Sequence, residues 1–474
     1  MAPHNAVSDI GLIGLGTMGA MLSLNIADNG FNISVFNRTT SRTHEFKDEA
    51  GALSDKITAC DTLEDLVASL KAPRAIILMV PAGEIVDQQI AALRPLLDKD
   101  DLIIDAGNAN FRDTQLRAAD AKAQGVPFLG IGVSGGEEGA RFGPSIMGGG
   151  PKEGWDRVSN ILTAISAKYE DTPCATWMGE GGAGHFVKAV HNGIEYADMQ
   201  MIAETYGIMR DGQGMSADAC AKVFDAWNDG PLQSYLVEIS GKVAAAGDDG
   251  GTPMLDVIMD KAGQKGTGRW TVIEAQHLGA PVPVIEAAVA ARNLSALKDE
   301  RLKGEKAFGA APVELPKDAL SDDDLENALM VGKIMCYAQG YALLNAASAE
   351  FDWSLPMADI AEVWREGCII RSAMLNDMAS ALTEDAQRNL IFAPYFAELI
   401  NANLPALRKT VTTAMAHGLQ VPALAAALSY FDMMRTGRST ANMIQAQRDF
   451  FGAHGFERVD KDGKGFHGPW GGQL

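Results

Sequence analysis

Short runs of apolar residues alternate with stretches of helical periodicity over the first third of the chain. Such runs, flanked by Gly, Pro and Asn, are typical of strands that are buried on both faces of a parallel sheet. The runs are Asp9–Gly14, Ile33–Asn37, Ala75–Val80, Leu102–Asp105 and Phe128–Val133. Because helical stretches separate them, the pattern predicts an α/β domain with a doubly wound sheet.

A cluster of glycines at 179–184 ends this region. Beyond it, long Ala- and Met-rich segments have helical periodicity and the strand pattern disappears. Ser321, followed by three aspartates, is a strong helix start, because its hydroxyl can accept hydrogen bonds from free backbone N–H groups. We therefore expect an α/β domain at 1–181 and a large all-helical domain at 182–437.

The chain changes character again from about Arg438. The last residues, ending in FHGPWGGQL, are rich in Gly and aromatic side chains and show no periodicity. Leaving those aromatic side chains in water would be unfavourable, so the segment is expected to dock on another surface. We expect 438–474 to be a tail that reaches a partner subunit.

Composition places the chain among folded proteins and excludes several kinds of partner. Its 474 residues are 47% hydrophobic, and 61 acidic against 40 basic residues give a formal charge of −21. We expect neither a nucleic-acid nor a membrane surface, since both need basic patches. The five cysteines have no metal or disulfide spacing, and the start lacks the basic region of a signal peptide. We expect reduced thiols, no metal and a cytoplasmic location.

The first predicted strand runs into a glycine-rich turn that opens a helix. Glycines in this setting allow a tight turn and the close approach of a pyrophosphate to the helix N-terminus. The turn predicts a dinucleotide site, and the alternative is a glycine turn needed only for packing. Its residues are Gly14, Leu15, Gly16, Thr17, Met18 and Gly19.

The end of the second predicted strand indicates which dinucleotide binds. An NAD site usually carries an acid here, whereas this chain has Asn37, Arg38 and Thr39. A guanidinium and two small polar groups can receive the 2′-phosphate that a carboxylate would repel. We expect NADP, the alternative being that Arg38 is only a solvated charge at a strand end.

The segment GHFVKAVHNGIEY carries the strongest candidates for acid–base chemistry. At 100° per residue, four of its polar side chains fall within roughly a 100° arc of one helix. They are Lys188, His191, Asn192 and Glu195. An exposed charged face would explain them on an arbitrary helix. Burial beside a cofactor would instead lower the pKa of the lysine, which could then act as a base with the glutamate as acid.

Three polar loops that contain glycine supply further candidates. They are SGGEEGAR (Ser134–Arg141), QKGTGRW (Gln264–Trp270) and QRDFFGAH (Gln447–His454). A set of cations could bind a phosphate or a carboxylate, although the sequence alone does not bring its members together. This set comprises Lys265, Arg292, Arg448 and His454.

In this order, the segments closely resemble the decarboxylating 6-phosphogluconate dehydrogenases of the β-hydroxyacid dehydrogenase superfamily. The resemblance covers essentially the whole chain, from GLGTMG through FNRT, IIDAGN, SGGEEGAR, GHFVKAVHNGIEY, KGTGRWT and QRDFFGAH to FHGPW. It implies a Rossmann-like dinucleotide-binding domain, a large all-α domain and a C-terminal tail that docks on the partner of a homodimer.

The resemblance also implies roles for individual residues. Lys188 would be the general base and later acid, and Glu195 would protonate the product carbon. The residues lining the sugar acid would be Asn108, Ser134, Gly135, Gly136, His191, Asn192 and Tyr196. Lys265, Thr267 and Arg292 would receive its phosphate, and Arg448 and His454 would come from the other subunit. Val80, Pro81 and Ala82, with Asn108, would border the nicotinamide.

The expected reaction is the NADP-dependent oxidative decarboxylation of 6-phosphogluconate to ribulose 5-phosphate and carbon dioxide. Two alternatives stay open. The first is another β-hydroxyacid dehydrogenase that acts on a short unphosphorylated acid, but it gives no reason for KGTGRW or QRDFFGAH. The second is a catalytically silent NADP-binding sensor, which would have no need to keep both Lys188 and Glu195.

Overall fold

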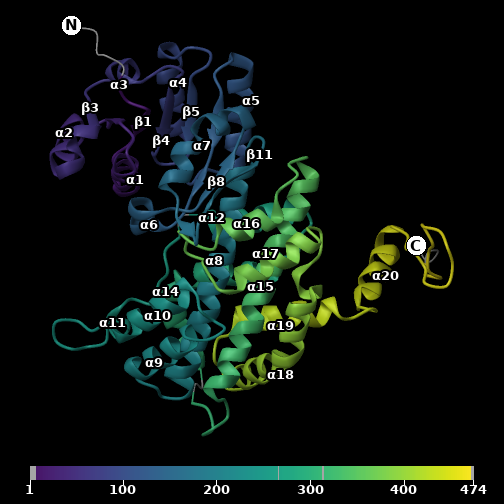
Figure 1. Cartoon of the computed structure of the whole chain (residues 1–474). Coiled ribbons are helices and arrows are strands. Elements are labelled where there is room, and N and C mark those ends of the chain that lie inside the picture. The colour runs from purple at the N-terminus through teal and green to yellow at the C-terminus, as the bar shows by residue number, and fades with distance from the viewer. Residues whose placement is uncertain (1–6, 265, 312–313, 471–474) are drawn as a thin grey trace. The chain divides into compact units, whose positions relative to one another are not determined.

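The computed structural model describes residues 7–264, 266–311 and 314–470. It contains two compact units, Met1–Ala427 and Leu428–Leu474 (Figure 1). The first unit begins with an α/β part and continues with helices, whereas the second contains the end of one helix, a further helix and a returning loop.

Six parallel strands form the main sheet, in the order β3-β2-β1-β4-β5-β6. The strands are β1 (Ile10–Ile13), β2 (Ile33–Phe36), β3 (Ile57–Cys60), β4 (Ala75–Leu78), β5 (Leu102–Asp105) and β6 (Phe128–Gly130). The helices between them are α1 (Thr17–Asp28), α2 (Thr40–Glu49), α3 (Leu63–Ser69), α4 (Glu84–Leu93) and α5 (Phe111–Gln124). This confirms the predicted doubly wound sheet. The strand order reverses between β1 and β4, so the loops after these strands flank a crevice.

Two predictions of strands need correction. The strand β3 was not predicted, because its two central residues are only half-buried and leave no continuous apolar run. The run Phe128–Val133, predicted as one strand, is divided at Ile131: β6 extends the main sheet, while β7 (Gly132–Val133) pairs antiparallel with β8 (Ile146–Gly149). β11 (Ala175–Gly179) completes this second sheet. A Cβ at Gly132 would lie 2.5 Å from the Cβ of Lys188, so this strand passes directly against the next long helix.

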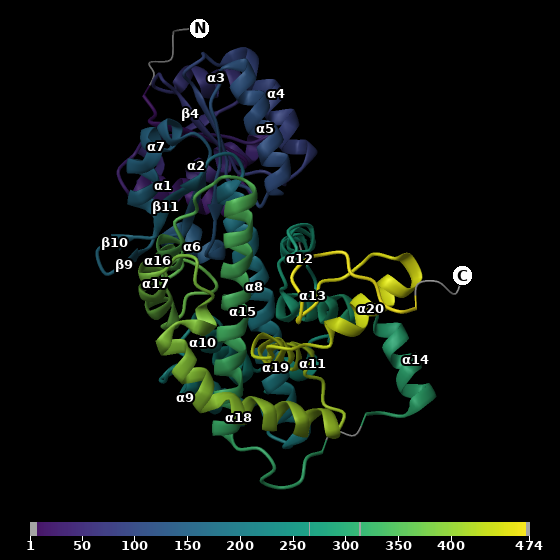
Figure 2. The same cartoon turned by 90° about the vertical axis from the view of Figure 1, so that its right-hand side faces the viewer.

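Beyond β11, helices dominate the described part of the chain, as predicted. Two long helices, α8 (Ala183–Gly207) and α15 (Asp322–Glu350), lie side by side (Figure 2). Ser321 caps α15 as expected, because its hydroxyl accepts the N–H of Asp324 at 3.1 Å. The other helices after β6 are α6 (Gly136–Phe142), α7 (Lys152–Ile165), α9 (Ala217–Asn228), α10 (Tyr235–Ala245), α11 (Met254–Val257), α12 (Thr267–His277), α13 (Pro283–Ser295), α14 (Lys298–Phe308), α16 (Met357–Val363), α17 (Met374–Glu384), α18 (Pro394–Ala416) and α19 (Pro422–Met434).

A buried ion pair joins the two long helices. Lys333 Nζ of α15 lies 2.5 Å from Asp198 Oδ2 of α8, and both side chains are buried. Because Asp198 is one turn beyond Glu195, the pair holds the middle of α8 against the helical core.

The second unit contains α20 (Ala441–Gly452), in the segment whose sequence shows no periodicity. Most apolar and polar side chains of this helix are exposed, so no buried apolar stripe marks its sequence. The exposed apolar side chains are Met443, Ile444, Phe450 and Phe451.

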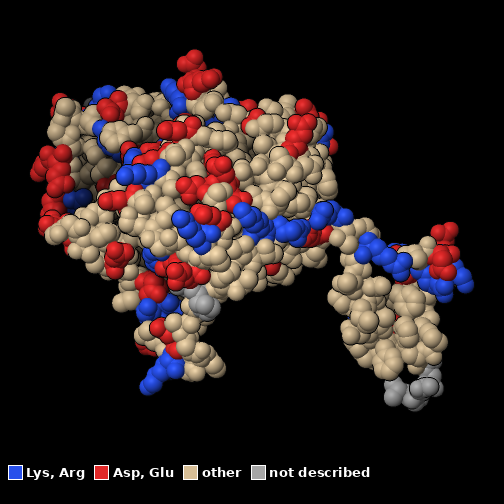
Figure 3. Space-filling model, turned by 90° about the horizontal axis from the view of Figure 1, so that it is seen from below, with Lys and Arg blue, Asp and Glu red and all other residues tan. Residues whose placement is uncertain are grey.

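The surface and the thiols agree with the composition. On the face seen in Figure 3, acidic side chains are widely spread and basic side chains lie among them. All five cysteines are buried and unpaired, as expected. Within the described ranges, no helix combines the length and the apolar character needed to cross a membrane.

Candidate active site

The three glycines of the turn after β1 have different surroundings. Gly14 has a φ of +104°, and a Cβ there would lie 2.4 Å from the carbonyl oxygen of Met79. A Cβ at Gly19 would lie 1.9 Å from the carbonyl oxygen of Gly14, so this glycine lets α1 pack against the turn. At Gly16, no described atom lies within 4 Å of the Cβ position, and no side chain caps α1. The open approach and the free N–H groups fit a pyrophosphate.

The end of β2 fits a 2′-phosphate. The backbone N–H of Leu15 donates to Asn37 Oδ1 at 3.1 Å, which ties β2 to the glycine turn. Arg38 is exposed, and it forms no ion pair with a carboxylate in the described ranges. The N-cap residue of α2, Thr39, makes no side-chain cap, and the first turn of α2 carries no acid. A free guanidinium therefore lies beside a helix N-terminus with uncapped N–H groups.

The residues expected near the nicotinamide follow β4 and β5 at the same edge of the sheet. Val80 is half-buried, whereas Pro81, Ala82 and Asn108 are exposed. Val80 adjoins the glycine turn, since a Cβ at Gly14 would lie 3.0 Å from a methyl carbon of Val80, and β1 and β4 are hydrogen-bonded neighbours.

Arg117 of α5 supports this crevice, and the sequence analysis missed it. Its guanidinium donates to the Gly83 carbonyl at 3.0 Å and to Asp87 at 2.7 Å, and Nη1 lies 3.6 Å from Asp105 Oδ2. The arginine thus joins the loop after β4 to the last residue of β5. No local sequence pattern predicts these contacts, because the residues that Arg117 contacts lie up to 34 residues away from it in the chain.

Lys188 lies at the centre of a buried polar cluster on α8. Its Nζ donates to Ser134 Oγ at 3.0 Å and to Asn192 Oδ1 at 2.7 Å, and it lies 3.3 Å from His191 Nδ1. The residue is only 7% exposed. The alternative of a solvated charged face is therefore wrong for this part of the helix.

Burial acts in opposite directions on the two candidate acid–base groups. It lowers the pKa of Lys188 from 10.5, although the negative charge of Glu195 opposes this shift. It raises the pKa of Glu195 from 4.5, against the positive charges of Lys188 and Arg292. Burial therefore favours a neutral amine and a protonated carboxyl, which are the forms that a base and an acid need.

His191 connects these groups as a neutral ring. Burial and then the charge of Lys188 hold its pKa well below the usual 6.5. Its Nε2 lies 3.3 Å from Ser134 Oγ, and its Nδ1 lies 3.0 Å from Asn192 Oδ1 and 3.8 Å from Glu195 Oε2. The ring thereby fixes the side chains on both sides of the lysine.

A second group of predicted residues gathers around Tyr196, which follows Glu195 on α8. The guanidinium of Arg292 stacks 3.7 Å from the ring centroid of Tyr196. A Cβ at Gly268 would lie 2.5 Å from the same ring, so the first turn of α12 presses against it. Thr267 begins that helix, and its N-cap Gly266 provides no side-chain cap. An arginine beside free helix N–H groups fits a phosphate.

The loop after α16 forms another wall of the site, and sequence reasoning missed it. The ring of Trp364 meets that of His191 edge-on, with 5.7 Å between centroids. A Cβ at Gly135 would lie 2.6 Å from the carbonyl oxygen of Gly367. Burial raises the pKa of the Cys368 thiol, which lies near Lys188, to about 12, so this thiol stays protonated.

Asn108 follows β5, and the other residues predicted for catalysis and substrate binding fall into three sets. Lys188, Ser134, His191, Asn192 and Glu195 come together, with Gly135 and Gly136 in the turn after Ser134 at φ values of +106° and +63°. Tyr196, Thr267 and Arg292 form the neighbouring group. Arg448 and His454 belong to the second unit, and Lys265 lies outside the described residues.

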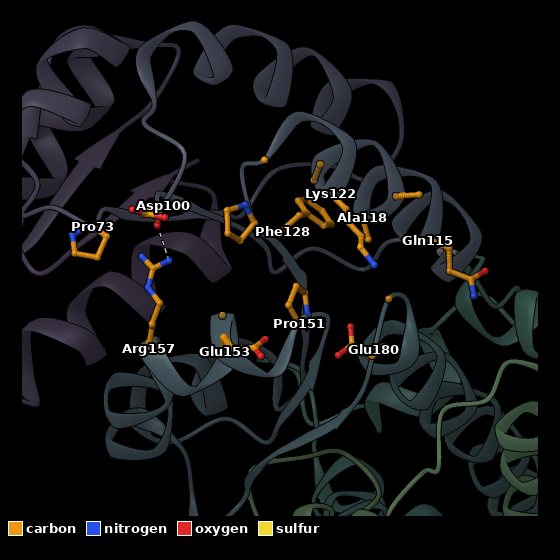
Figure 4. Close-up of a pocket in the computed structure, with 16 residues that line it drawn as sticks. Pro73, Asp100, Gln115, Ala118, Lys122, Phe128, Pro151, Glu153, Arg157 and Glu180 are labelled. Atoms are coloured by element: carbon orange, nitrogen blue, oxygen red, sulfur yellow. Dashed lines mark hydrogen bonds between the residues drawn. The ribbon is translucent and has the colours of Figure 1, made fainter.

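A cavity of about 1110 Å³ lies elsewhere, at the β6 edge of the sheet between α5 and α7 (Figure 4). Side chains of both charges line it, and Arg157 Nη1 donates to the Asp100 carbonyl at 2.5 Å. None of the described residues assigned to cofactor or substrate lines this cavity.

Comparisons with known proteins agree over the whole chain. Residues 9–179 match the family described as the NAD binding domain of 6-phosphogluconate dehydrogenase, and residues 184–470 match its C-terminal domain. The chain is 47% identical to an NADP(+)-dependent, decarboxylating 6-phosphogluconate dehydrogenase of Bacillus subtilis, over 97% of this chain and 98% of that protein. It is 45% identical to an NAD(+)-dependent one from the same organism, over 98% and 99%.

A solved structure shows the same similarity in three dimensions. The 6-phosphogluconate dehydrogenase of Plasmodium falciparum, described in its apo form, with NADP+ and with 6-phosphogluconate, gives a TM-score of 0.93. It is 41% identical, and the match covers 98% of this chain and 100% of that one.

Proposed function

The chain belongs to the 6-phosphogluconate dehydrogenase family, and we propose that Lys188 and Glu195 perform the proton transfers of its reaction. That reaction is the NADP-dependent oxidative decarboxylation of 6-phosphogluconate to ribulose 5-phosphate, carbon dioxide and NADPH. The observation that carries the assignment is the buried Lys188 amine, held by Ser134 and Asn192 on the helix face that also bears Glu195.

In the first step, the neutral Nζ of Lys188 accepts the proton of the substrate's 3-hydroxyl. The residues of the glycine turn would hold NADP, which would supply the hydride acceptor for carbon 3. The Oγ of Ser134 and the Oδ1 of Asn192 fix two N–H bonds of the amine, which orients its lone pair toward the hydroxyl. The result is a β-keto acid.

In the second step, the bond between carbons 1 and 2 breaks and carbon dioxide leaves. The electron pair moves into the ketone, and the protonated Lys188 donates a proton to the resulting oxyanion to give an enediol. Glu195 then protonates the carbon that becomes carbon 1 of the product, while Lys188 takes back the enediol proton. A proton passing from Lys188 to Glu195 restores the pair, so the cycle consumes no net proton.

The cofactor and the phosphate have separate binding groups in this proposal. Gly14–Gly19 would hold the pyrophosphate of NADP, Arg38 its 2′-phosphate, and Val80–Ala82 and Asn108 its nicotinamide. The substrate phosphate would lie at the N-terminus of α12, where Thr267 and Arg292 would receive it. The family resemblance adds Lys265, which lies outside the described residues. The close contact between Arg292 and Tyr196 supports this placement.

A homodimer with exchanged tails completes the site. The family resemblance supports this, because it assigns Arg448 and His454 to the partner's substrate. The exposed Phe450 and Phe451 also need a covering surface. In this arrangement 1–181 is the NADP-binding domain, 182–437 the substrate and dimerisation domain and 438–474 the tail. The five free thiols fit a reducing compartment, and we place the enzyme in the cytoplasm.

A substrate panel tests the proposed function. NADPH absorbance and released carbon dioxide are measured with 6-phosphogluconate, gluconate and 3-hydroxyisobutyrate. Equal amounts of NADPH and carbon dioxide are expected from 6-phosphogluconate, with no turnover once Lys188→Ala removes the base. Turnover of 3-hydroxyisobutyrate in preference would indicate a short-acid dehydrogenase, and NADP binding without turnover would indicate a sensor.

A further inference from the structure

In the second unit, several hydrogen bonds converge on the carboxylate of Asp449, near the end of α20. The side chain is 3% exposed, although most residues around it in the sequence are exposed. Four hydrogen bonds reach it. Its Oδ1 accepts from Gly455 N at 2.9 Å and His467 Nδ1 at 2.7 Å, and its Oδ2 accepts from Gly468 N and Trp470 Nε1, both at 2.9 Å.

Three of these donors belong to the FHGPW motif, to which the reaction assigns no task. The chain returns to α20 through an antiparallel bridge between Phe456 and Phe466, whose backbone groups bond at 2.9 Å in both directions. The carboxylate accepts hydrogen bonds from both ends of the loop that this bridge closes, from Gly455 at one end and from the FHGPW residues at the other. The Gly468 N–H, as the largest influence, lowers the pKa of Asp449 to about 2, so the carboxylate is ionised at neutral pH.

The two residues assigned to the partner's site are linked to this carboxylate through their neighbours. Arg448 precedes Asp449 and donates from Nη1 to Gln445 Oε1 at 3.0 Å. Gln445 in turn donates to the Gly455 carbonyl at 3.0 Å, and the N–H of Gly455 is one of the four donors to Asp449. His454 directly precedes Gly455, and its ring lies edge-on to that of Phe451, with 5.9 Å between centroids.

We propose that Asp449 is a positioning residue that closes 449–470 into a preformed clasp, which presents Arg448 and His454 to the substrate of the partner subunit. The inference rests on the proposed tail exchange. A loop fixed before it binds loses little conformational freedom on docking, so the clasp holds the two side chains in the geometry that binding requires. Only a carboxylate suits the position, because an amide would turn an N–H group toward backbone and side-chain donors.

The variant Asp449→Asn tests the clasp, with Asp460→Asn as the matched control. Asp460 is another tail carboxylate, but it is exposed and pairs only with Arg458 among the described residues. The KM for 6-phosphogluconate should rise about 10- to 100-fold in Asp449→Asn, since a small misplacement of a binding group has effects of that size. The KM for NADP should stay within about twofold in both variants, because the cofactor residues belong to the first unit.

A chain that ends at Gly465 provides the second variant. It lacks the three donors of FHGPW, so its KM for 6-phosphogluconate should rise by about the same factor as in Asp449→Asn. Combining the truncation with Asp449→Asn should raise this KM no further. The clasp would be overturned if the two changes raised this KM multiplicatively when combined, or if Asp449→Asn kept the wild-type KM. Thermal unfolding and size-exclusion chromatography identify any variant that loses its fold or its assembly.

Arg448→Ala distinguishes a failure of the clasp from a failure of the proposed tail exchange. If Arg448→Ala loses activity while Asp449→Asn behaves as wild type, the clasp is wrong and the tail retains its role. If both variants have wild-type kinetics, the tail does not contribute to a substrate site.

Discussion

At the scale of single residues, burial and charge oppose each other on α8. Burial lowers the pKa of Lys188 and raises that of Glu195, while the attraction between their charged forms acts against both shifts. The buried ring of His191 stays neutral between them. Desolvation thereby brings the pKa values of the proposed base and the proposed acid toward each other.

The pH dependence of kcat/KM for 6-phosphogluconate should follow from these directions. Activity should rise with pH as Lys188 loses its proton, below the ordinary lysine pKa of 10.5, and fall again as Glu195 loses its own, above 4.5. Glu195→Gln keeps the shape but cannot ionise. Its weaker residual activity should therefore keep the rise and lose the alkaline fall. If the alkaline fall persists unchanged, another group donates the proton.

Arg38 should decide the choice of cofactor. Charge-assisted hydrogen bonds contribute on the order of 1.5 to 3 kcal/mol, so Arg38→Ala should weaken NADP binding by about 10- to 150-fold. NAD binding should be nearly unchanged, because NAD has no 2′-phosphate. Arg42→Ala is the matched control, since Arg42 is a nearby arginine already paired with Glu49 at 3.2 Å. Fluorescence titration of both cofactors provides the measurement, and equal losses for NADP and NAD would remove Arg38 from this role.

At the scale of elements, the site depends on how closely α12 crosses α8. The hydroxyl of Thr271 donates to the Ala189 carbonyl at 2.6 Å, and a Cβ at Gly193 would lie 2.6 Å from the Thr271 methyl carbon. The two glycines Gly193 and Gly268 therefore allow the contact that brings the first turn of α12 beside Tyr196.

Gly193→Ala should separate these helices. Overpacking of this kind destabilises by about 1–3 kcal/mol, and the KM for 6-phosphogluconate should rise because Thr267 moves with α12. Gly207→Ala is the control on the same helix, where no described atom lies within 4 Å of the Cβ position. It should be neutral or slightly stabilising. Urea unfolding and KM measurements compare the two, and equal stability of both variants would mean that the crossing tolerates a methyl group.

Elements also explain which features the sequence could predict. The glycine turn and the polar face of α8 are local, since one helix period or one turn places their members together. The wall formed by Trp364 and Gly367 was not predictable, because Trp364 lies 364 − 191 = 173 residues from His191 and Gly367 lies 367 − 135 = 232 residues from Gly135 in the chain. Asp449 was missed for a related reason: its donors follow 6 to 21 residues later, in a loop without periodicity.

At the scale of the whole molecule, the proposed function divides one active site between the two units of a dimer. The first unit contains the cofactor crevice, the acid–base pair and the group proposed for the substrate phosphate. The second carries Arg448 on α20 and His454 just after that helix. A dimer of twofold symmetry with exchanged tails would build each site from Lys188 of one chain and Arg448 of the other.

Mixing two inactive variants tests this composite site most directly. Lys188→Ala and Arg448→Ala should each be inactive as homodimers. In a hybrid dimer both defects fall on one site, so the other site is intact. Random pairing at equal amounts makes about half of the dimers hybrid, and roughly a quarter of wild-type activity should return. Activity is measured after co-expression, with hybrid dimers verified by two affinity tags. Recovery to that level is the predicted result, and verified hybrids without activity would contradict the account.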